Sequence, residues 1–231
     1  MLNLIPSAIL LGSNSRLFSG KLYSMYAPRI YLYDHSEQHN SGFPAIPRYL
    51  DKIEDYIDYI TSRSAGANAN DYFGLEKERH DDLRIRLNSE FYRVETRIMS
   101  VQPTPKEMVA MIEFFIGFLY KAILDGKTLR PLSSIREERM AVIHSGYDAK
   151  THFDVSETAR SQVHTAKQGL LDLGLGSEFI GILEQRLTNK TSPALYVSRL
   201  WDSKYNGNIC QTVSEIIQHV WEKTKNNSPL L

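Results

Sequence analysis

Residues 82–112 read DLRIRLNSEFYRVETRIMSVQPTPKEMVAMI, and this stretch holds the clearest local pattern in the chain. Apolar and polar residues alternate over residues 83–87 and again over 94–98, which is typical of strands because successive side chains point to opposite faces. Asn88-Ser89-Glu90 supplies turn-forming residues between the two runs. The stretch therefore predicts a β-hairpin with one apolar face and one charged face.

The charged face of this hairpin carries more base than acid. A single carboxylate, that of Glu95, would lie among Arg84, Arg86, Arg93 and Arg97. Arginine binds phosphate and carboxylate groups through paired hydrogen bonds, and Mg²⁺ accepts carboxylate oxygens as ligands. One interpretation is therefore a site for a polyanion and a divalent metal. The other is an ordinary solvated face, on which arginines and glutamates pair across the strands.

A long helix is predicted directly after the hairpin. Thr104-Pro105-Lys106-Glu107 forms a capping box with proline at the first helical position. Apolar residues at helical spacing then continue through Leu124, and Asp125-Gly126 ends the pattern. Because this is the most apolar helix of the sequence, we expect it to be a core element.

The remaining segments are mostly helical in pattern. Residues 1–11 are apolar but too short to span a bilayer, so they predict a buried helix. Residues 46–60 predict an amphipathic helix, whereas Arg29–Asp34 alternates and predicts a strand. The helices expected after residue 133 span about Ser134–His144, Ser156–Leu173, Ser177–Leu187, Pro193–Trp201 and Cys210–Lys223.

The composition argues against a charge-driven partner. The 231 residues include 27 acidic and 27 basic side chains, so the chain has no overall field that would recruit nucleic acid or an anionic membrane. We therefore expect neither as a partner. The single cysteine, Cys210, cannot form an intrachain disulfide and lies in a helical pattern. It predicts a buried thiol in a reducing compartment and hence a cytoplasmic protein.

Three segments of the sequence resemble runs found in one enzyme family. Residues 94–104 read VETRIMSVQPT, residues 10–20 read LLGSNSRLFSG, and residues 135–149 read IREERMAVIHSGYDA. Each is similar to a run in the glutamate–cysteine ligase family of carboxylate–amine ligases, and they occur in the family's order. The sequence also departs from the family pattern, since Arg16 replaces a proline and Ser100 an aspartate.

The resemblance implies an α+β fold. Its antiparallel sheet would form part of an open barrel of the glutamine-synthetase type, followed by a mainly helical C-terminal region. We expect the sheet-containing, catalytic-type part and its packed helices over residues 1–130, and the helical region over residues 131–231.

The resemblance also implies a reaction. Members use ATP and Mg²⁺ to activate an amino-acid carboxylate as an acyl phosphate, which an amine then attacks. Positioning and neutralisation of phosphate charge would supply most of the catalysis. The site residues implied by resemblance are Glu95 for the metal, Arg93, Arg97, Asn14 and Ser15 for the nucleotide, and Arg29 and Arg139 for catalysis.

A complete site would need more acid than the motifs provide. Magnesium takes six oxygen ligands, and one carboxylate is too few for a multi-metal centre. Family members have an N-terminal segment with further strands and metal-binding glutamates. We therefore expect a second protein chain supplying those strands, or a homo-oligomer, with an amino acid or peptide as substrate. Two alternatives remain, a non-catalytic scaffold or regulatory subunit with the ligase fold and a helical interaction domain.

Overall fold

The computed structural model describes residues 1–35, 49, 52–63, 82–87, 92–126 and 129–231. The chain divides into two compact units. Unit 1 comprises Met1, Asn3–Pro28 and Met99–Leu231, and unit 2 comprises Leu2 and Arg29–Ile98.

The C-terminal part of unit 1 is helical, as predicted. Each of the five expected helices is present, with ends displaced by at most four residues. They are α6 (Leu132–Ser145), α7 (Val155–Asp172), α8 (Gly181–Asn189), α9 (Pro193–Lys204) and α10 (Ile209–Lys225). A short 3₁₀ helix, η2 (Gly146–Asp148), follows α6, and another, η1 (Leu2–Leu4), begins the chain.

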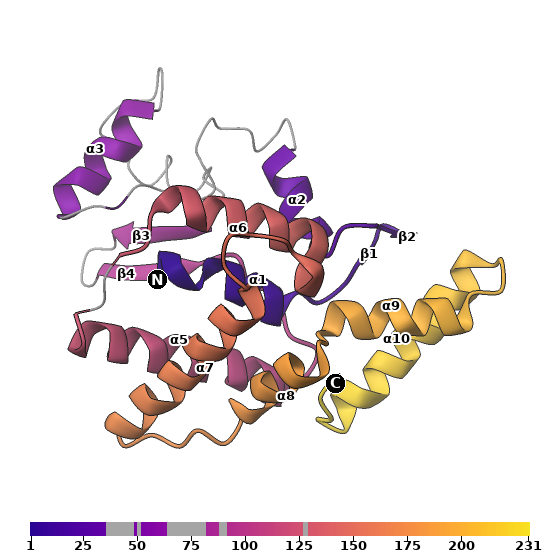
Figure 1. The fold of residues 1–231 in the computed structure, drawn as a ribbon. Coiled ribbons are helices and arrows are strands. Elements are labelled where there is room, and N and C mark those ends of the chain that lie inside the picture. Colours follow the sequence, from indigo (N-terminus) through magenta and orange to yellow (C-terminus); the bar gives the residue numbers. More distant parts are fainter. Residues whose placement is uncertain (36–48, 50–51, 64–81, 88–91, 127–128) are drawn as a thin grey trace. The chain divides into compact units, whose positions relative to one another are not determined.

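Helix α1 (Ile5–Gly12) lies at the centre of unit 1. Every one of its residues is buried, which confirms the predicted buried N-terminal helix. A helix that is apolar on all sides needs cover on all sides. Contacts from α6, α7 and α8 provide it, and Figure 1 shows α1 in indigo between α6 and α7.

Helix α5 (Pro105–Leu124) has the predicted bounds and the predicted cap, in which the Thr104 hydroxyl accepts a hydrogen bond from the Glu107 amide at 3.3 Å. It crosses α7 at two glycines. A Cβ atom on Gly117 would lie 2.0 Å from the Ala166 carbonyl oxygen, and one on Gly169 would lie 1.9 Å from the Gly117 carbonyl oxygen. Since real side chains never approach a backbone so closely, only glycine permits this crossing.

The helices α9 and α10 pack against each other as an antiparallel pair (Figure 1). Cys210 lies in the first turn of α10 and is exposed, so the prediction of a buried thiol was wrong. The buried residues of α10 are Thr212 and Ile216. Cys210 is two positions from Thr212, which is about 200° around the helix, and therefore lies on the opposite side.

Unit 2 contains the predicted hairpin. Strand β3 (Leu83–Leu87) pairs antiparallel with β4 (Tyr92–Thr96). Ile85 faces Val94 across the ladder, and the register also sets Arg84 opposite Glu95 and Arg86 opposite Arg93, so the apolar and polar positions match as predicted. The turn residues lie outside the described part of the chain.

The segment after Pro28 is a helix, α2 (Pro28–His35), and the strand predicted for Arg29–Asp34 was wrong. Proline fits the first helical position because its fixed φ suits a helix. Two i,i+4 contacts then favour the helix over an extended chain. The Arg29 guanidinium lies 5.3 Å from the centre of the Tyr33 ring, and the Tyr31 ring stacks on His35 at 4.1 Å.

The described residues are mostly helical and contain two small antiparallel sheets, but no barrel. The second sheet joins β1 (Leu17–Phe18) and β2 (Lys21–Leu22) in unit 1. Helix α3 (Ile53–Arg63) confirms a helix in the region predicted for 46–60, of which residues 46–48 and 50–51 lie outside the description. In the part of the chain that the structure describes, no helix combines the length and apolar character needed to cross a bilayer.

Candidate functional site

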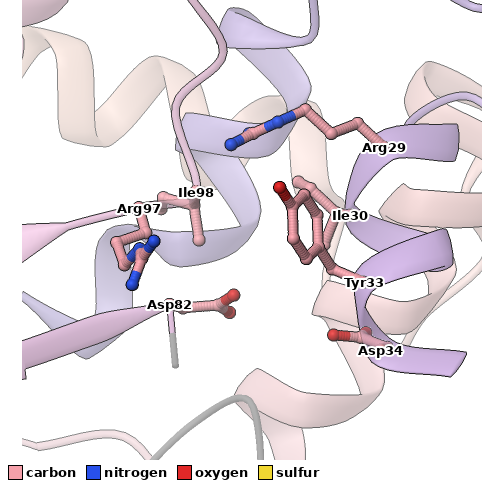
Figure 2. A pocket seen from close by; sticks show the side chains of 7 residues that line it. All are labelled: Arg29, Ile30, Tyr33, Asp34, Asp82, Arg97 and Ile98. Atoms are coloured by element: carbon pink, nitrogen blue, oxygen red, sulfur yellow. The ribbon is translucent and has the colours of Figure 1, made fainter. Parts of the chain in front are cut away.

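A small pocket lies within unit 2, between α2 and the open ends of the hairpin strands. Arg29, Tyr33 and Asp34 reach it from α2, and Asp82 and Arg97 reach it from the strand ends (Figure 2). Its volume is about 30 Å³, which admits one small group rather than a whole ligand. Four of these five side chains are charged, two positive and two negative.

The hairpin itself places Asp82 beside Arg97. The Arg97 amide donates to the Asp82 carbonyl at 2.8 Å, which continues the ladder by one step beyond β4. Asp82 is buried. The Arg97 Nε atom lies 4.0 Å from Glu95 Oε1, and these two side chains are 31% and 32% exposed. Glu95 and Arg97 thus form a loose, half-solvated ion pair at the edge of the pocket.

Helix α2 brings a second guanidinium to the pocket. Arg29 lies in the first turn of α2 and extends over the ring of Tyr33. In Figure 2 the Arg29 side chain extends toward the strand end that carries Arg97. Two guanidinium groups from segments distant in sequence therefore share one pocket, an arrangement that can bind a phosphate or carboxylate oxygen group.

The pocket also contains two carboxylates that the sequence patterns did not single out. Asp34 ends the run that was interpreted as a strand, and only its helical geometry turns it toward the pocket. Asp82 directly precedes β3. Its place next to a predicted strand is the feature of the sequence that could have indicated its position. Both lessen the excess of positive charge inferred from the hairpin alone.

The other predicted site residues lie elsewhere. Arg93 is exposed on β4, and the side chains of Arg84 and Arg86 lie outside the description. Arg139 is a buried residue of α6 in unit 1, with Nη1 3.6 Å from the sulfur of Met140. Asn14 and Ser15 are in the loop after α1, also in unit 1. Among the predicted residues, the structure brings together Arg29, Arg97 and Glu95.

The described residues supply only part of a magnesium site. Glu95 and Asp82 offer the hard oxygen ligands that Mg²⁺ prefers. Yet the described residues contain no group of three or more histidine, cysteine, aspartate or glutamate side chains placed to hold a metal ion. The described residues thus supply two oxygen ligands and two guanidinium groups, but not a complete metal centre.

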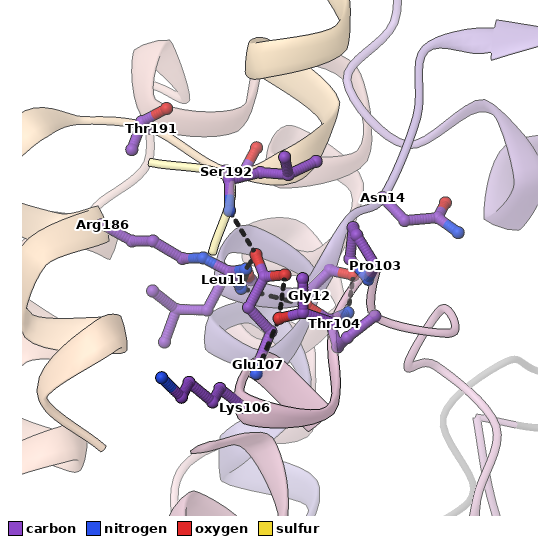
Figure 3. Close-up of polar contacts among 12 residues, drawn as sticks. Leu11, Gly12, Asn14, Pro103, Thr104, Lys106, Glu107, Arg186, Thr191 and Ser192 are labelled. Atoms are coloured by element: carbon purple, nitrogen blue, oxygen red, sulfur yellow. Dashed lines mark hydrogen bonds and ion pairs between the residues drawn. The ribbon is translucent and has the colours of Figure 1, made fainter. Parts of the chain in front are cut away.

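Two of the segments that resemble the ligase family meet in the core of unit 1. The Gln102 side-chain amide donates to the Gly12 carbonyl at 2.8 Å and to the Ser100 carbonyl at 3.0 Å. The Asn14 side-chain amide donates to the Val101 carbonyl at 3.2 Å. The last part of this segment, which lies in unit 1, is therefore joined to the end of α1 and the loop that follows it, and Figure 3 shows Pro103 and Thr104 near Gly12 and Asn14.

A buried ion pair completes this junction. Arg186 and Glu107 are both 0% exposed, and Arg186 Nη2 donates to Glu107 Oε1 at 2.5 Å. Arg186 Nη1 donates to the Leu11 carbonyl at 2.6 Å and to Gln102 Oε1 at 3.0 Å. The Thr104 hydroxyl donates to the second Glu107 oxygen at 2.7 Å. Burial lowers the pKa of Arg186, whereas the charge of Glu107 and its hydrogen bond act in the opposite direction.

The third segment reaches the same place through Tyr147 and through Gly146, which packs against the ring of Tyr26. The Tyr26 hydroxyl donates to the Leu10 carbonyl, and the Tyr147 hydroxyl donates to the Thr191 carbonyl at 2.8 Å. Gly146 has a φ of 57°, and a Cβ atom there would lie 2.3 Å from the Tyr26 ring. Burial raises the pKa of both tyrosines. The segments around residues 10–20, 94–104 and 135–149 thus converge on the C-terminal end of α1.

A protein-family model matches most of the chain. The model of glutamate-cysteine ligase family 2 (GCS2) matches residues 1–171, a range that includes the three converging segments and the pocket of Arg29 and Arg97 but ends before Arg186. A search among curated proteins finds no match. Since the family model covers residues 1–171 of a 231-residue chain, the protein belongs to glutamate-cysteine ligase family 2.

Proposed function

We propose that the chain is an ATP-dependent carboxylate–amine ligase. The observation that carries this proposal is the convergence of Arg29 and Arg97 on one pocket, in a chain of a ligase family. Joining a carboxylate to an amine requires that the carboxylate first be activated, and ATP does so by transferring its terminal phosphoryl group. The negative charge in that step is what paired guanidinium groups stabilise.

The size of the pocket suggests which part of a substrate it receives. A volume of about 30 Å³ excludes a nucleotide but admits one phosphate or carboxylate oxygen group. Arg29 and Arg97 would hold that group, and the exposed Arg93 would attract the anion from the hairpin face. Arg139, Asn14 and Ser15, all in unit 1, stay candidates by family likeness for the substrate carboxylate and the nucleotide.

Magnesium would bind next to this pocket, with Glu95 as one of its ligands. When bound, the ion neutralises phosphate charge beyond what the arginines supply. Further carboxylates would come from a second protein chain or another copy of this one. In that assembly, β3 and β4 would be two strands of a glutamine-synthetase-like barrel, because unpaired strand edges favour addition of strands from a partner.

The test is ADP release by the purified protein, alone and with any copurifying partner. ATP, Mg²⁺ and glutamate are supplied with a panel of amines. Replacing the guanidinium in Arg97→Met should lower kcat/KM by about 100-fold or more, as expected when a charge-stabilising group is lost. The matched control is Arg160→Met, which removes an exposed arginine of α7 whose Nε atom lies 3.4 Å from Glu157 Oε1, and it should leave turnover unchanged.

A non-catalytic scaffold or regulatory subunit is the second candidate. The absence of a three-residue metal cluster among the described residues is the observation that favours it. Such a protein would bind a partner chain yet show no calorimetric response to ATP and Mg²⁺. Absence of ADP release with every amine, alone and with partner, would overturn the ligase proposal, as would full activity in Arg97→Met.

A further inference from the structure

The two edges of the hairpin in unit 2 differ. In an antiparallel pair, residues whose backbone groups bond to the partner strand alternate with residues whose backbone groups point away from it. The Arg97 amide donates to the Asp82 carbonyl at 2.8 Å, so the backbone groups of Arg97 face the partner strand. Counting back by two along β4, the residues whose N–H and C=O groups point outward are Tyr92, Val94 and Thr96.

The outer edge of β3 is already occupied at its centre. The Ile85 amide donates to the Tyr56 hydroxyl at 3.0 Å. Tyr56 belongs to α3 and is 2% exposed, so this contact is a buried part of unit 2. Strand β3 therefore offers no continuous edge to another strand.

The outer edge of β4 has no such cover among the described residues. In the described part of the chain, this sheet consists of β3 and β4, and no described group bonds to the outward backbone groups of Val94. Val94 is 52% exposed, whereas Leu83 on the same face of the hairpin is 6% exposed. An uncovered edge with an exposed apolar side chain favours pairing with another strand.

The sequence of β4 is complementary to itself. If two copies pair antiparallel about Val94, the new hydrogen bonds join Val94 to Val94 and Tyr92 to Thr96. Arg93 of each copy then lies opposite Glu95 of the other, at positions where facing side chains approach most closely. The pairing covers both exposed valines and matches each base with an acid.

Charge disfavours the neighbouring registers. Because only the outward-facing residues can form the new hydrogen bonds, the second strand can shift only by two residues at a time. A shift in one direction sets Arg93 opposite Arg93, and a shift in the other sets Glu95 opposite Glu95. Like charges directly opposite each other are destabilising. The register centred on Val94 is the one that pairs all five residues of β4.

We propose that β4 pairs antiparallel with β4 of a second copy of this chain, centred on Val94. The product is a four-stranded sheet in the order β3, β4, β4, β3, with a two-fold axis between the two valines. Its outer edges are those of β3, where Tyr56 occupies the central amide, so the assembly ends at two copies. The contribution of this dimer to the ligase site rests on the proposed function, whereas the pairing itself does not.

Sedimentation velocity tests the pairing without ATP. Five strand residues from each copy form a small interface, so we expect a reversible dimer that depends on protein concentration. As the concentration rises, the parent protein should shift from its monomer mass of 26.5 kDa toward twice that value.

Charge reversal supplies the variants. Arg93→Glu leaves only acids at the two facing positions, and Glu95→Arg leaves only bases. Each variant alone should raise the dissociation constant of the dimer by roughly tenfold or more. An equal mixture of the two should dimerise again, because the copy with two acids then faces the copy with two bases. Mixing would not rescue a variant whose hairpin had unfolded.

The matched control is Arg160→Glu. It makes the same change of charge as Arg93→Glu, on α7, at a side chain that is 48% exposed. Because this position lies outside the hairpin, the variant should leave the dissociation constant unchanged.

The results separate this inference from the ligase proposal. A dimer that both reversals weaken and their mixture restores supports the pairing, even if no amine gives ADP release. A parent that stays monomeric, which would leave the edge of β4 to a strand of another protein, overturns it, even if that monomer is an active ligase. A dimer that either reversal leaves intact, or a mixture that does not associate, also overturns it.

Discussion

The chain contains two arginine–glutamate pairs that differ in almost every physical respect. Arg186 and Glu107 are fully buried, 2.5 Å apart. Arg97 and Glu95 are about one-third exposed, and their nearest charged atoms lie 4.0 Å apart. The first pair joins α8 to α5 and to the end of α1, whereas the second lies at the edge of a pocket.

This difference teaches that burial, and not residue type, decides what such a pair does. A buried charge that loses its partner is strongly destabilising. Neither Arg186 nor Glu107 can therefore exchange its partner for a ligand without a large loss of stability. An exposed pair contributes little to stability and can exchange its partner for a ligand at small cost. The pair suited to binding is therefore the weaker one.

The largest expected effect comes from breaking the buried pair. Arg186→Met leaves the Glu107 charge without its guanidinium and should reduce the free energy of unfolding by about 3–5 kcal/mol. Urea denaturation followed by circular dichroism measures this. The control is the double variant Arg186→Met/Glu107→Leu, which removes both charges and should recover most of the loss. A single variant as stable as the parent would show that the pair is not a structural element.

A smaller effect is expected from the group that supports Glu107. Thr104→Val removes the hydroxyl that both caps α5 and donates to the Glu107 carboxylate. The free energy of unfolding should therefore fall by about 1–3 kcal/mol. Thr104→Ser keeps the hydroxyl and is the matched control. A Thr104→Val variant as stable as the parent would show that these hydrogen bonds do not stabilise the helix.

Removing the partly exposed arginine should change stability less. Arg97→Met is expected to lower the free energy of unfolding by less than Arg186→Met does, because partly solvated ion pairs contribute less than fully buried ones. The same urea titration measures this beside Arg186→Met. If the two variants lost similar stability, the distinction between a structural and a binding pair would fail.

The smallest effect concerns two tyrosines near the buried pair, and it is measurable only at alkaline pH. Burial raises the pKa of Tyr26 and Tyr147, so the folded state favours their neutral form. Their contribution to stability is complete below the ordinary tyrosine pKa of about 10 and declines as the pH rises above it. Absorbance at alkaline pH should show both ionising only on unfolding. Tyr147→Phe should reduce this delayed fraction, whereas Tyr205→Phe, at an exposed position, should not.

Local signals were enough to predict much of the fold. The hairpin, the capped helix α5 and the buried α1 were each predicted from residues close together in the sequence, namely an alternating run, a capping box with apolar helical spacing, and a short apolar run. The alternation over Arg29–Asp34 was misleading because, in so short a run, the i,i+4 partners of a helix fit equally well. The predicted loop of the hairpin lies outside the described residues.

The candidate sites were less accessible to sequence reasoning. The charge pattern drew attention to Arg97 and Glu95, two residues apart, but contained no sign of Arg186, which is separated from Glu107 by 79 positions. Asp34 reaches the pocket of Arg97 only through tertiary structure, whereas Asp82 reaches it through the pairing of the hairpin strands.

One consequence concerns where this protein could be cut. The likeness to the family stops at residue 171, inside α7, whereas the guanidinium that satisfies both Glu107 and the Leu11 carbonyl comes from residue 186. A fragment trimmed to the family match would keep an acid in its interior with that counterion gone. A fragment that folds stably must therefore extend beyond residue 171, where the match to the family ends.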